Sequence, residues 1–156
     1  MQGQKGRAAG PRTAGAVAAA CLPACLLLVM PRASLLLAAC APDLNAPPDI
    51  AWDHAVCTEC GMLVSDPAYG SALVLGDGKM LPFDDPGCLL KYMMDQKPSV
   101  HAMWFHDGAQ DRWLRESEAA FTGGHVSPMG SGLMPVPAGT PSSMTIGEAS
   151  TAVVAP

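Results

Sequence analysis

The regular part of the hydrophobic pattern begins with two apolar runs on either side of a short polar turn. Gly70–Leu75 and Met80–Phe83 are apolar, and Gly76-Asp77-Gly78-Lys79 separates them. Asp-Gly between two apolar runs is a strong hairpin signal, because this pair tolerates the positive φ angles of a tight turn. The pattern therefore predicts two antiparallel strands joined by this turn.

A helix is predicted directly after the second strand. Asp85 suits the N-cap position, where its carboxylate can accept a backbone hydrogen bond, and Pro86 suits the first helical position. The helix is expected to end near Gln96, since Pro98 follows. The run Ser99–His106 is then typical of a strand. The order strand, strand, helix, strand predicts an α+β fold.

The remainder of the chain carries weaker signals. Gln110–Phe121 has helical character and is expected to belong to a second, smaller unit. The loop that follows brings His125 near Met129 in the sequence. Residues 135–156 are rich in Pro, Ser, Thr, Ala and Gly, and are predicted to be largely disordered.

Residues 1–39 have the composition of an export signal. They contain basic residues, no acidic residue, and two apolar stretches at 13–30 and 33–39. Leu37-Ala38-Ala39-Cys40 resembles the lipobox of bacterial lipoproteins, which implies cleavage before Cys40 and acylation of that cysteine. Retention of the first stretch as a membrane helix is the alternative, since ~18 apolar residues can just span a bilayer.

Cleavage at this point would leave a strongly acidic chain. Four of the nine Lys and Arg residues precede Cys40, so five remain with all fourteen Asp and Glu residues, a formal charge of −9. This charge argues against nucleic acid as a partner. The Pro- and Asp-rich segment 40–53 is predicted to be a tether from an acyl anchor in the membrane to a folded domain at 54–134.

The six cysteines do not form an obvious disulfide framework. Two lie in the leader and Cys40 is the expected acylation site, which leaves Cys57, Cys60 and Cys88. An odd number leaves at least one thiol for another purpose, and metal binding or redox chemistry is favoured. Cys88, on the predicted helix, is interpreted as a small buried residue, and Asp84 and Asp85 as turn and capping residues.

The segment Cys57-Thr-Glu-Cys60-Gly61-Met62 carries the clearest chemistry. Two thiols and a thioether are soft ligands that select Cu(I), or Zn²⁺ when four donors are available. A zinc-stabilised interaction module would need Cys88 and a histidine to complete the set. A thiol oxidoreductase would use Cys57 and Cys60, but Gly61 and Pro67 make poor helix sequence after the pair. A structural disulfide between the two is a further alternative.

Several motifs together resemble the NosL family of periplasmic copper-binding lipoproteins, which accompany nitrous oxide reductase and are described as copper chaperones. The resemblance rests on the Cys-x-x-Cys-Gly-Met segment, the apolar hairpin, Phe83-Asp84-Asp85, Pro128-Met129-Gly130-x-Gly132 and the lipobox. It spans 57–134 and implies two small related units of strand-strand-helix-strand character.

The resemblance also implies a function and a ligand set. Cys60 and Met129 are expected to bind Cu(I), with Met62, Cys57 and His125 as candidate additional ligands. The expected role is that of a lipid-anchored periplasmic protein that supplies copper to nitrous oxide reductase or its maturation machinery. No glycine loop for nucleotides and no Ser/His/Asp signature is visible in the sequence, so we do not expect an enzyme.

Overall fold

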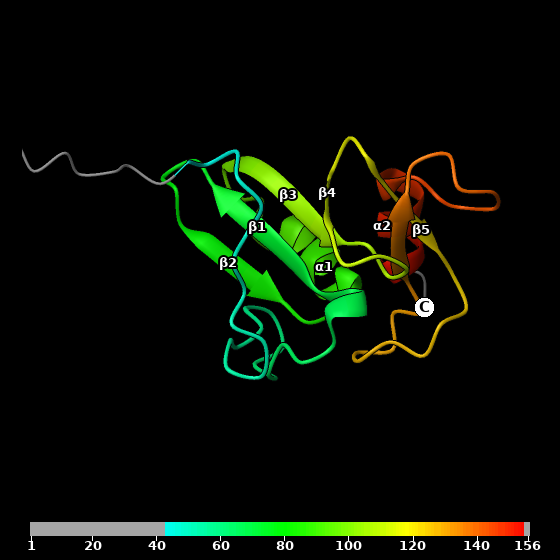
Figure 1. Ribbon diagram of the computed structural model, residues 1–156, viewed down its shortest axis with the longest axis horizontal. Coiled ribbons are helices and arrows are strands. Elements are labelled where there is room, and N and C mark those ends of the chain that lie inside the picture. The colour runs from blue at the N-terminus through cyan, green and yellow to red at the C-terminus, as the bar shows by residue number, and fades with distance from the viewer. Residues whose placement is uncertain (1–42, 155–156) are drawn as a thin grey trace, which may run out of the picture. The chain divides into compact units, whose positions relative to one another are not determined.

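The computed structural model describes residues 43–154, so the leader, the lipobox and Cys40 lie outside the described residues. The main sheet is antiparallel with the strand order β2-β1-β3-β4. Its strands are β1 (Ser71–Leu75), β2 (Met80–Phe83), β3 (Val100–His106) and β4 (Trp113–Arg115). Figure 1 shows this sheet with helix α1 (Pro86–Gln96) against it.

The strand-strand-helix-strand unit is confirmed. Gly78 has a φ of 86°, and the hairpin closes with a hydrogen bond from Leu75 N–H to Lys79 O of 2.9 Å. The Asp85 carboxylate caps α1 by accepting from Gly87 N–H at 2.7 Å. At the other end Lys97 adopts the left-handed conformation and Pro98 follows, which stops the helix.

The segment predicted as a tether is part of the folded domain from residue 44 onward. β1 is buried along almost its whole length, because α1 covers one face and this segment adds apolar side chains to the core. Ile50 is buried, the Trp52 ring lies against Gly70, and Leu44 lies against Gly78. The tether prediction is therefore wrong for the described residues 44–53, because these apolar side chains complete the core.

The helix predicted at 110–121 is also wrong. The chain forms β4 there, which pairs with β3 through Phe105–Leu114, and then β5 (Ala119–Thr122). The turn between β3 and β4 is closed by Asp107, which is fully enclosed and accepts from Arg112 Nε at 3.0 Å. Pairing with an existing sheet edge outweighs the local helix propensity.

Residues 135–154 are ordered, so the prediction of a disordered tail is wrong there. β6 (Met134–Pro137) pairs with β5 in a second antiparallel sheet, and α2 (Ile146–Val154) follows. Thr145 and Glu148 form a capping box at the start of α2: Thr145 N–H donates to Glu148 Oε2 at 2.7 Å, and Glu148 N–H donates to Thr145 Oγ1 at 3.3 Å. β5, β6 and α2 repeat the order of β1, β2 and α1, which confirms a second, smaller unit.

The two sheets share one core. Phe105 of β3 and Phe121 of β5 meet edge to face with ring centroids 4.9 Å apart, and neither side chain is exposed. Helices α1 and α2 also pack against each other. The second unit therefore has a fixed position on the first, which places the loop between β5 and β6 beside the start of α1.

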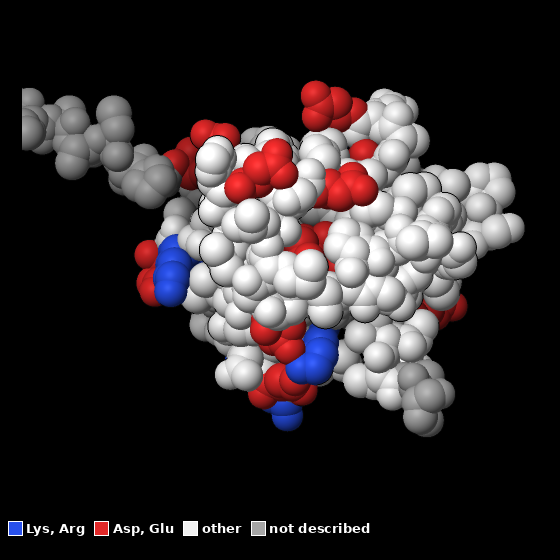
Figure 2. All heavy atoms as spheres, turned by 90° about the horizontal axis from the view of Figure 1, so that it is seen from below, with Lys and Arg blue, Asp and Glu red and all other residues white. Residues whose placement is uncertain are grey.

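Acidic residues clearly outnumber basic ones. The described residues contain fourteen Asp and Glu but only five Lys and Arg. On the face shown in Figure 2, acidic side chains are spread widely, and basic ones occupy small areas near the edge. Within residues 43–154 no helix is both long enough and apolar enough to cross a membrane.

Candidate metal centre

The Cys57–Met62 segment is a tight turn held by its own backbone. Cys57 N–H donates to Met62 O at 2.7 Å, and Gly61 N–H donates to Cys57 O at 3.0 Å. Gly61 has a φ of 78°, which a residue with a Cβ adopts only with strain. Thr58 N–H donates to Pro82 O at 2.9 Å and so fixes the turn to β2. The turn therefore presents both thiols from a rigid support.

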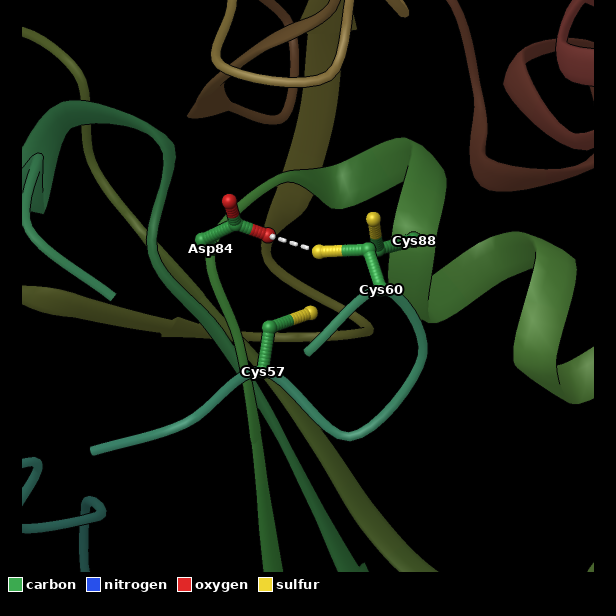
Figure 3. Close-up of side chains that lie close together, drawn as sticks. All are labelled: Cys57, Cys60, Asp84 and Cys88. Atoms are coloured by element: carbon green, nitrogen blue, oxygen red, sulfur yellow. Dashed lines mark hydrogen bonds between the residues drawn. The ribbon is translucent and has the colours of Figure 1, made fainter. Parts of the chain in front are cut away.

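Four side chains from three segments converge beside this turn. Cys57 and Cys60 come from the turn, Asp84 follows β2, and Cys88 lies in the first turn of α1. One ligand atom from each of the four lies within 4.8 Å of all the others, and Figure 3 shows the group. We call these four residues the thiol cluster. All three cysteines are free thiols, and Cys60 is the least buried of them.

The sulfur atoms share negative charge unequally. Interaction with the Cys88 thiol, together with hydrogen bonds from the backbone at Cys60 and Asp84, lowers the pKa of Cys57 to about 6. Burial raises the pKa of Cys60 to about 11, and the interaction with Cys57 raises the pKa of Cys88. At neutral pH the cluster therefore holds one thiolate and two thiols, a distribution that a cation would change by displacing protons.

The buried carboxylate of Asp84 has few hydrogen-bond partners. It is 1% exposed, and its Oδ1 accepts from the Cys60 Sγ at 3.4 Å. Its Oδ2 is buried and has no hydrogen-bond partner in the described part of the chain. Burying an ionised carboxylate without a counter-charge or hydrogen bonds is costly. The position of Asp84 therefore suits a residue that binds a cation.

The cluster opens on a cavity of about 550 Å³. Its walls include Cys60 and Cys88 from the cluster, Lys91 and Glu59, which form an ion pair, and Met129 from the β5–β6 loop. The Met129 side chain is 44% exposed, so a partner molecule can reach it. The cavity thus places a thioether on the same opening as two of the thiols.

Asp85 fixes the position of Met129. Its Oδ2 accepts from Met129 N–H at 3.0 Å, and its Oδ1 accepts from Ser131 Oγ at 2.5 Å as well as from the α1 backbone. The carboxylate is fully buried. The capping role predicted for Asp85 is confirmed, and the same side chain ties the Met129 loop to the helix that carries Cys88.

The structure places the other sequence candidates differently. Met62 is 51% exposed, and neither it nor His125 is among the described residues that line the cavity. His125 Nε2 is hydrogen-bonded to Thr122 Oγ1 at 2.9 Å, within its own loop. Both remain predictions as ligands.

Sequence reasoning missed two members of the cluster. Cys88 was interpreted as a buried residue and Asp84 as a turn residue, whereas both face Cys57 and Cys60. The one sequence signal was that Asp84 and Cys88 lie on either side of the predicted helix start at Asp85 and Pro86. The sequence alone could not show which side faced the Cys57–Met62 turn.

Fold and site together define a small α+β domain with a candidate soft-metal centre. No protein-family model matches the chain, and no curated protein matches it. Among solved structures the chain is similar to the crystal structure of the copper chaperone NosL from Shewanella denitrificans. The two share 17% sequence identity with a TM-score of 0.46, over 72% of this chain and 87% of that chain.

Proposed function

We propose that this chain is an exported, lipid-anchored accessory protein that binds Cu(I) and supplies it to the maturation of nitrous oxide reductase. The observation that carries the copper assignment is the meeting of three thiols within 4.8 Å at a cavity that also holds the exposed Met129. Thiolates and thioethers are the ligands that Cu(I) prefers.

The arrangement suits transfer of the ion. Cys57 and Cys88 are buried, whereas Cys60 is partly exposed and Met129 is accessible from solvent. An incoming ligand from another protein can approach Met129 and Cys60 first, while the buried thiols still hold the ion. Cu(I) can then leave by stepwise ligand exchange without appearing free in solution.

Thiol oxidoreductase activity is less well supported. An oxidoreductase needs an accessible thiolate to attack a disulfide. The thiol with the lowered pKa, Cys57, is only 2% exposed, and the pKa of the more accessible Cys60 is raised. The activated sulfur is therefore the inaccessible one, and we infer a binding protein rather than an enzyme.

The decisive measurement is an anaerobic titration of the reduced protein with Cu(I) in competition with a chromophoric Cu(I) chelator. We expect one Cu(I) per chain, with affinity reduced at least tenfold in Cys60→Ser and in Met129→Ala. Met94→Ala is the matched control, because it removes a methionine of α1 that does not line the cavity. A Cu(I) affinity that is unchanged in both Cys60→Ser and Met129→Ala would refute the assignment.

Location and partner rest on the sequence motifs. If Cys40 carries the anchor, Cys40→Ala should move the protein from the membrane fraction to the soluble periplasmic fraction. If the cargo serves nitrous oxide reductase, cells that rely on the Cys60→Ser variant should accumulate reductase with less copper. Normal copper content of the reductase in those cells would point to another recipient.

A further inference from the structure

The described chain enters the fold at one end of the main sheet. Leu44 packs on the turn between β1 and β2, since its Cδ2 lies 3.1 Å from the position that a Cβ would take at Gly78. Asn45 follows, and its Oδ1 accepts from His101 Nε2 at 3.2 Å and from Arg115 Nη2 at 3.1 Å. Figure 1 shows these first residues in cyan beside that turn. The domain therefore holds the chain firmly from residue 44 onward.

The metal cavity lies at the opposite end of the same strands. β2 runs from Met80, beside the turn, to Phe83, and Asp84 and the start of α1 follow directly. In Figure 1 the arrowhead of β2 marks this end of the sheet. Asp84 follows Gly78 by six residues, which in extended chain is about 20 Å. The entry point of the chain and the thiol cluster are therefore separated by the length of β2.

The surface at the turn has a different charge from the rest of the domain. We call it the hairpin end, and it consists of residues 43–44, 76–79 and 97–99. The last of these segments belongs to it because Gly76 N–H donates to Ser99 O at 3.0 Å. Two exposed lysines, Lys79 and Lys97, balance its two aspartates, whereas the described residues as a whole carry a formal charge of −9. A phospholipid surface with negative charge therefore repels the rest of the domain more strongly than the hairpin end.

A lipid anchor at Cys40 would reach the hairpin end over a very short link. Only Ala41 and Pro42 stand between Cys40 and Asp43. The three peptide units that join them span at most about 11 Å when fully extended. The headgroup region on each side of the hydrocarbon core is itself about 5–7 Å thick. The folded residues would therefore have little free chain with which to turn away from the membrane.

We propose that the hairpin end is the membrane-facing surface of this protein, and that the metal cavity lies on the side away from the bilayer. The proposal rests on the acylation of Cys40 within the proposed function, but it does not rest on copper binding. The short link holds residues 43–44 at the phospholipid headgroups, and β2 sets the thiol cluster about 20 Å further out. A partner then reaches the cavity from the aqueous compartment, without competing with the lipid surface.

The test measures how close each amide lies to the lipid headgroups. The acylated full chain, isotope-labelled for NMR, is placed in nanodiscs of phosphatidylethanolamine with phosphatidylglycerol as the minor lipid, and a few lipids carry a Gd³⁺ chelate on the headgroup. We expect the paramagnetic relaxation of amides at 76–79 and 97–99 to exceed that at 129–131 at least tenfold, because the effect falls with the sixth power of distance. The same chelate free in solution is the control, since it reports exposure alone.

A longer link gives the matched variant. An insertion of six Gly and Ser residues between Ala41 and Pro42 adds up to about 20 Å of reach and leaves residues 43–154 unchanged. The difference in relaxation between the two ends of the sheet should then shrink to less than about threefold. A difference that survives the insertion would contradict the short link as its cause.

Equal relaxation at the two ends of the sheet, or stronger relaxation at 129–131, would overturn the proposed orientation. Failure of the proposed function looks different. If Cys40 is not acylated, the mass of the mature chain includes no lipid and the protein does not stay with the nanodiscs, which would remove the anchor and the orientation together. A protein that fails to bind copper would instead show the same relaxation pattern.

Discussion

The Asp85 carboxylate accepts a hydrogen bond from the Met129 backbone N–H at 3.0 Å, although 44 residues separate the two in the chain. The same carboxylate caps the helix that carries Cys88. One buried side chain therefore ties the backbone of the Met129 loop to the helix that carries Cys88.

Replacement of Asp85 should affect both stability and metal binding. Asp85→Ala removes a helix cap, worth about 1 kcal/mol, and leaves Met129 N–H and Ser131 Oγ without their acceptor. We expect a loss of about 3 kcal/mol in chemical denaturation and faster amide exchange at residues 129–133. Asp66→Ala, which removes the exposed cap of the short helix Pro67–Tyr69, should cost less than about 1 kcal/mol. Equal effects of the two would contradict the special role of Asp85.

Gly87 should be needed for the approach of the Met129 loop. A Cβ at Gly87 would lie 2.5 Å from the Ser131 Cβ, so Gly87→Ala must push this loop away from α1. We expect Cu(I) affinity to fall about tenfold although no sulfur is changed. If the new Cβ met no neighbour, Gly87→Ala would instead stabilise the protein by about 1 kcal/mol, the usual gain of alanine over glycine in a helix.

Gly147→Ala provides the control, since nothing lies within 4 Å of a Cβ there. It should leave copper binding unchanged. Wild-type affinity in Gly87→Ala would show that the loop position does not matter for the metal.

Metal binding should release protons in a number set by the cluster. The pKa of Cys57 is about 6, so this thiol is already ionised at pH 7.5, whereas Cys60, with a pKa of about 11, and Cys88 are protonated. An ion bound by all three thiolates should therefore release about two protons, and affinity should fall as the pH falls. Below about pH 6 the dependence should steepen, because Cys57 then also binds a proton.

Calorimetric titrations in buffers with different heats of ionisation count these protons. Release of fewer than one proton by the wild-type protein would contradict binding by all three thiolates.

The second helix should be required for stability. Ala149 of α2 is completely buried, so Ala149→Asp places a charge in the core and should cost more than about 3 kcal/mol. Thr151→Asp, at an exposed position of the same helix, should stay within about 0.5 kcal/mol of wild type. Thermal unfolding followed by circular dichroism measures the stability of both variants. A tolerated Ala149→Asp would mean that α2 is not docked in solution.

Local signals predicted the first unit correctly and failed in the second. The Asp77-Gly78 turn and the Asp85-Pro86 cap are determined by neighbouring residues, so the sequence shows them directly. β4 depends on pairing with β3, and β6 on pairing with β5, and neither partner is visible from composition. One local signal in the tail was overlooked, the Thr145-x-x-Glu148 capping box.

The candidate site divides in the same way. Adjacent thiols in the Cys57–Met62 turn marked a metal or redox site from sequence alone. Met129 was named by family resemblance, and the structure places it at the cavity beside Cys60. Asp84 and Cys88 joined the cluster only through the packing of α1 against the turn, a tertiary contact that spacing did not specify.

Asp84 and Asp85 are adjacent in the chain but make different contacts. Asp84 accepts a hydrogen bond from the Cys60 sulfur, and Asp85 accepts one from the Met129 loop. A single peptide unit therefore connects the buried thiol cluster to the loop that carries Met129. A shift of Asp84 on metal binding is therefore expected to reach the backbone of the Met129 loop through Asp85.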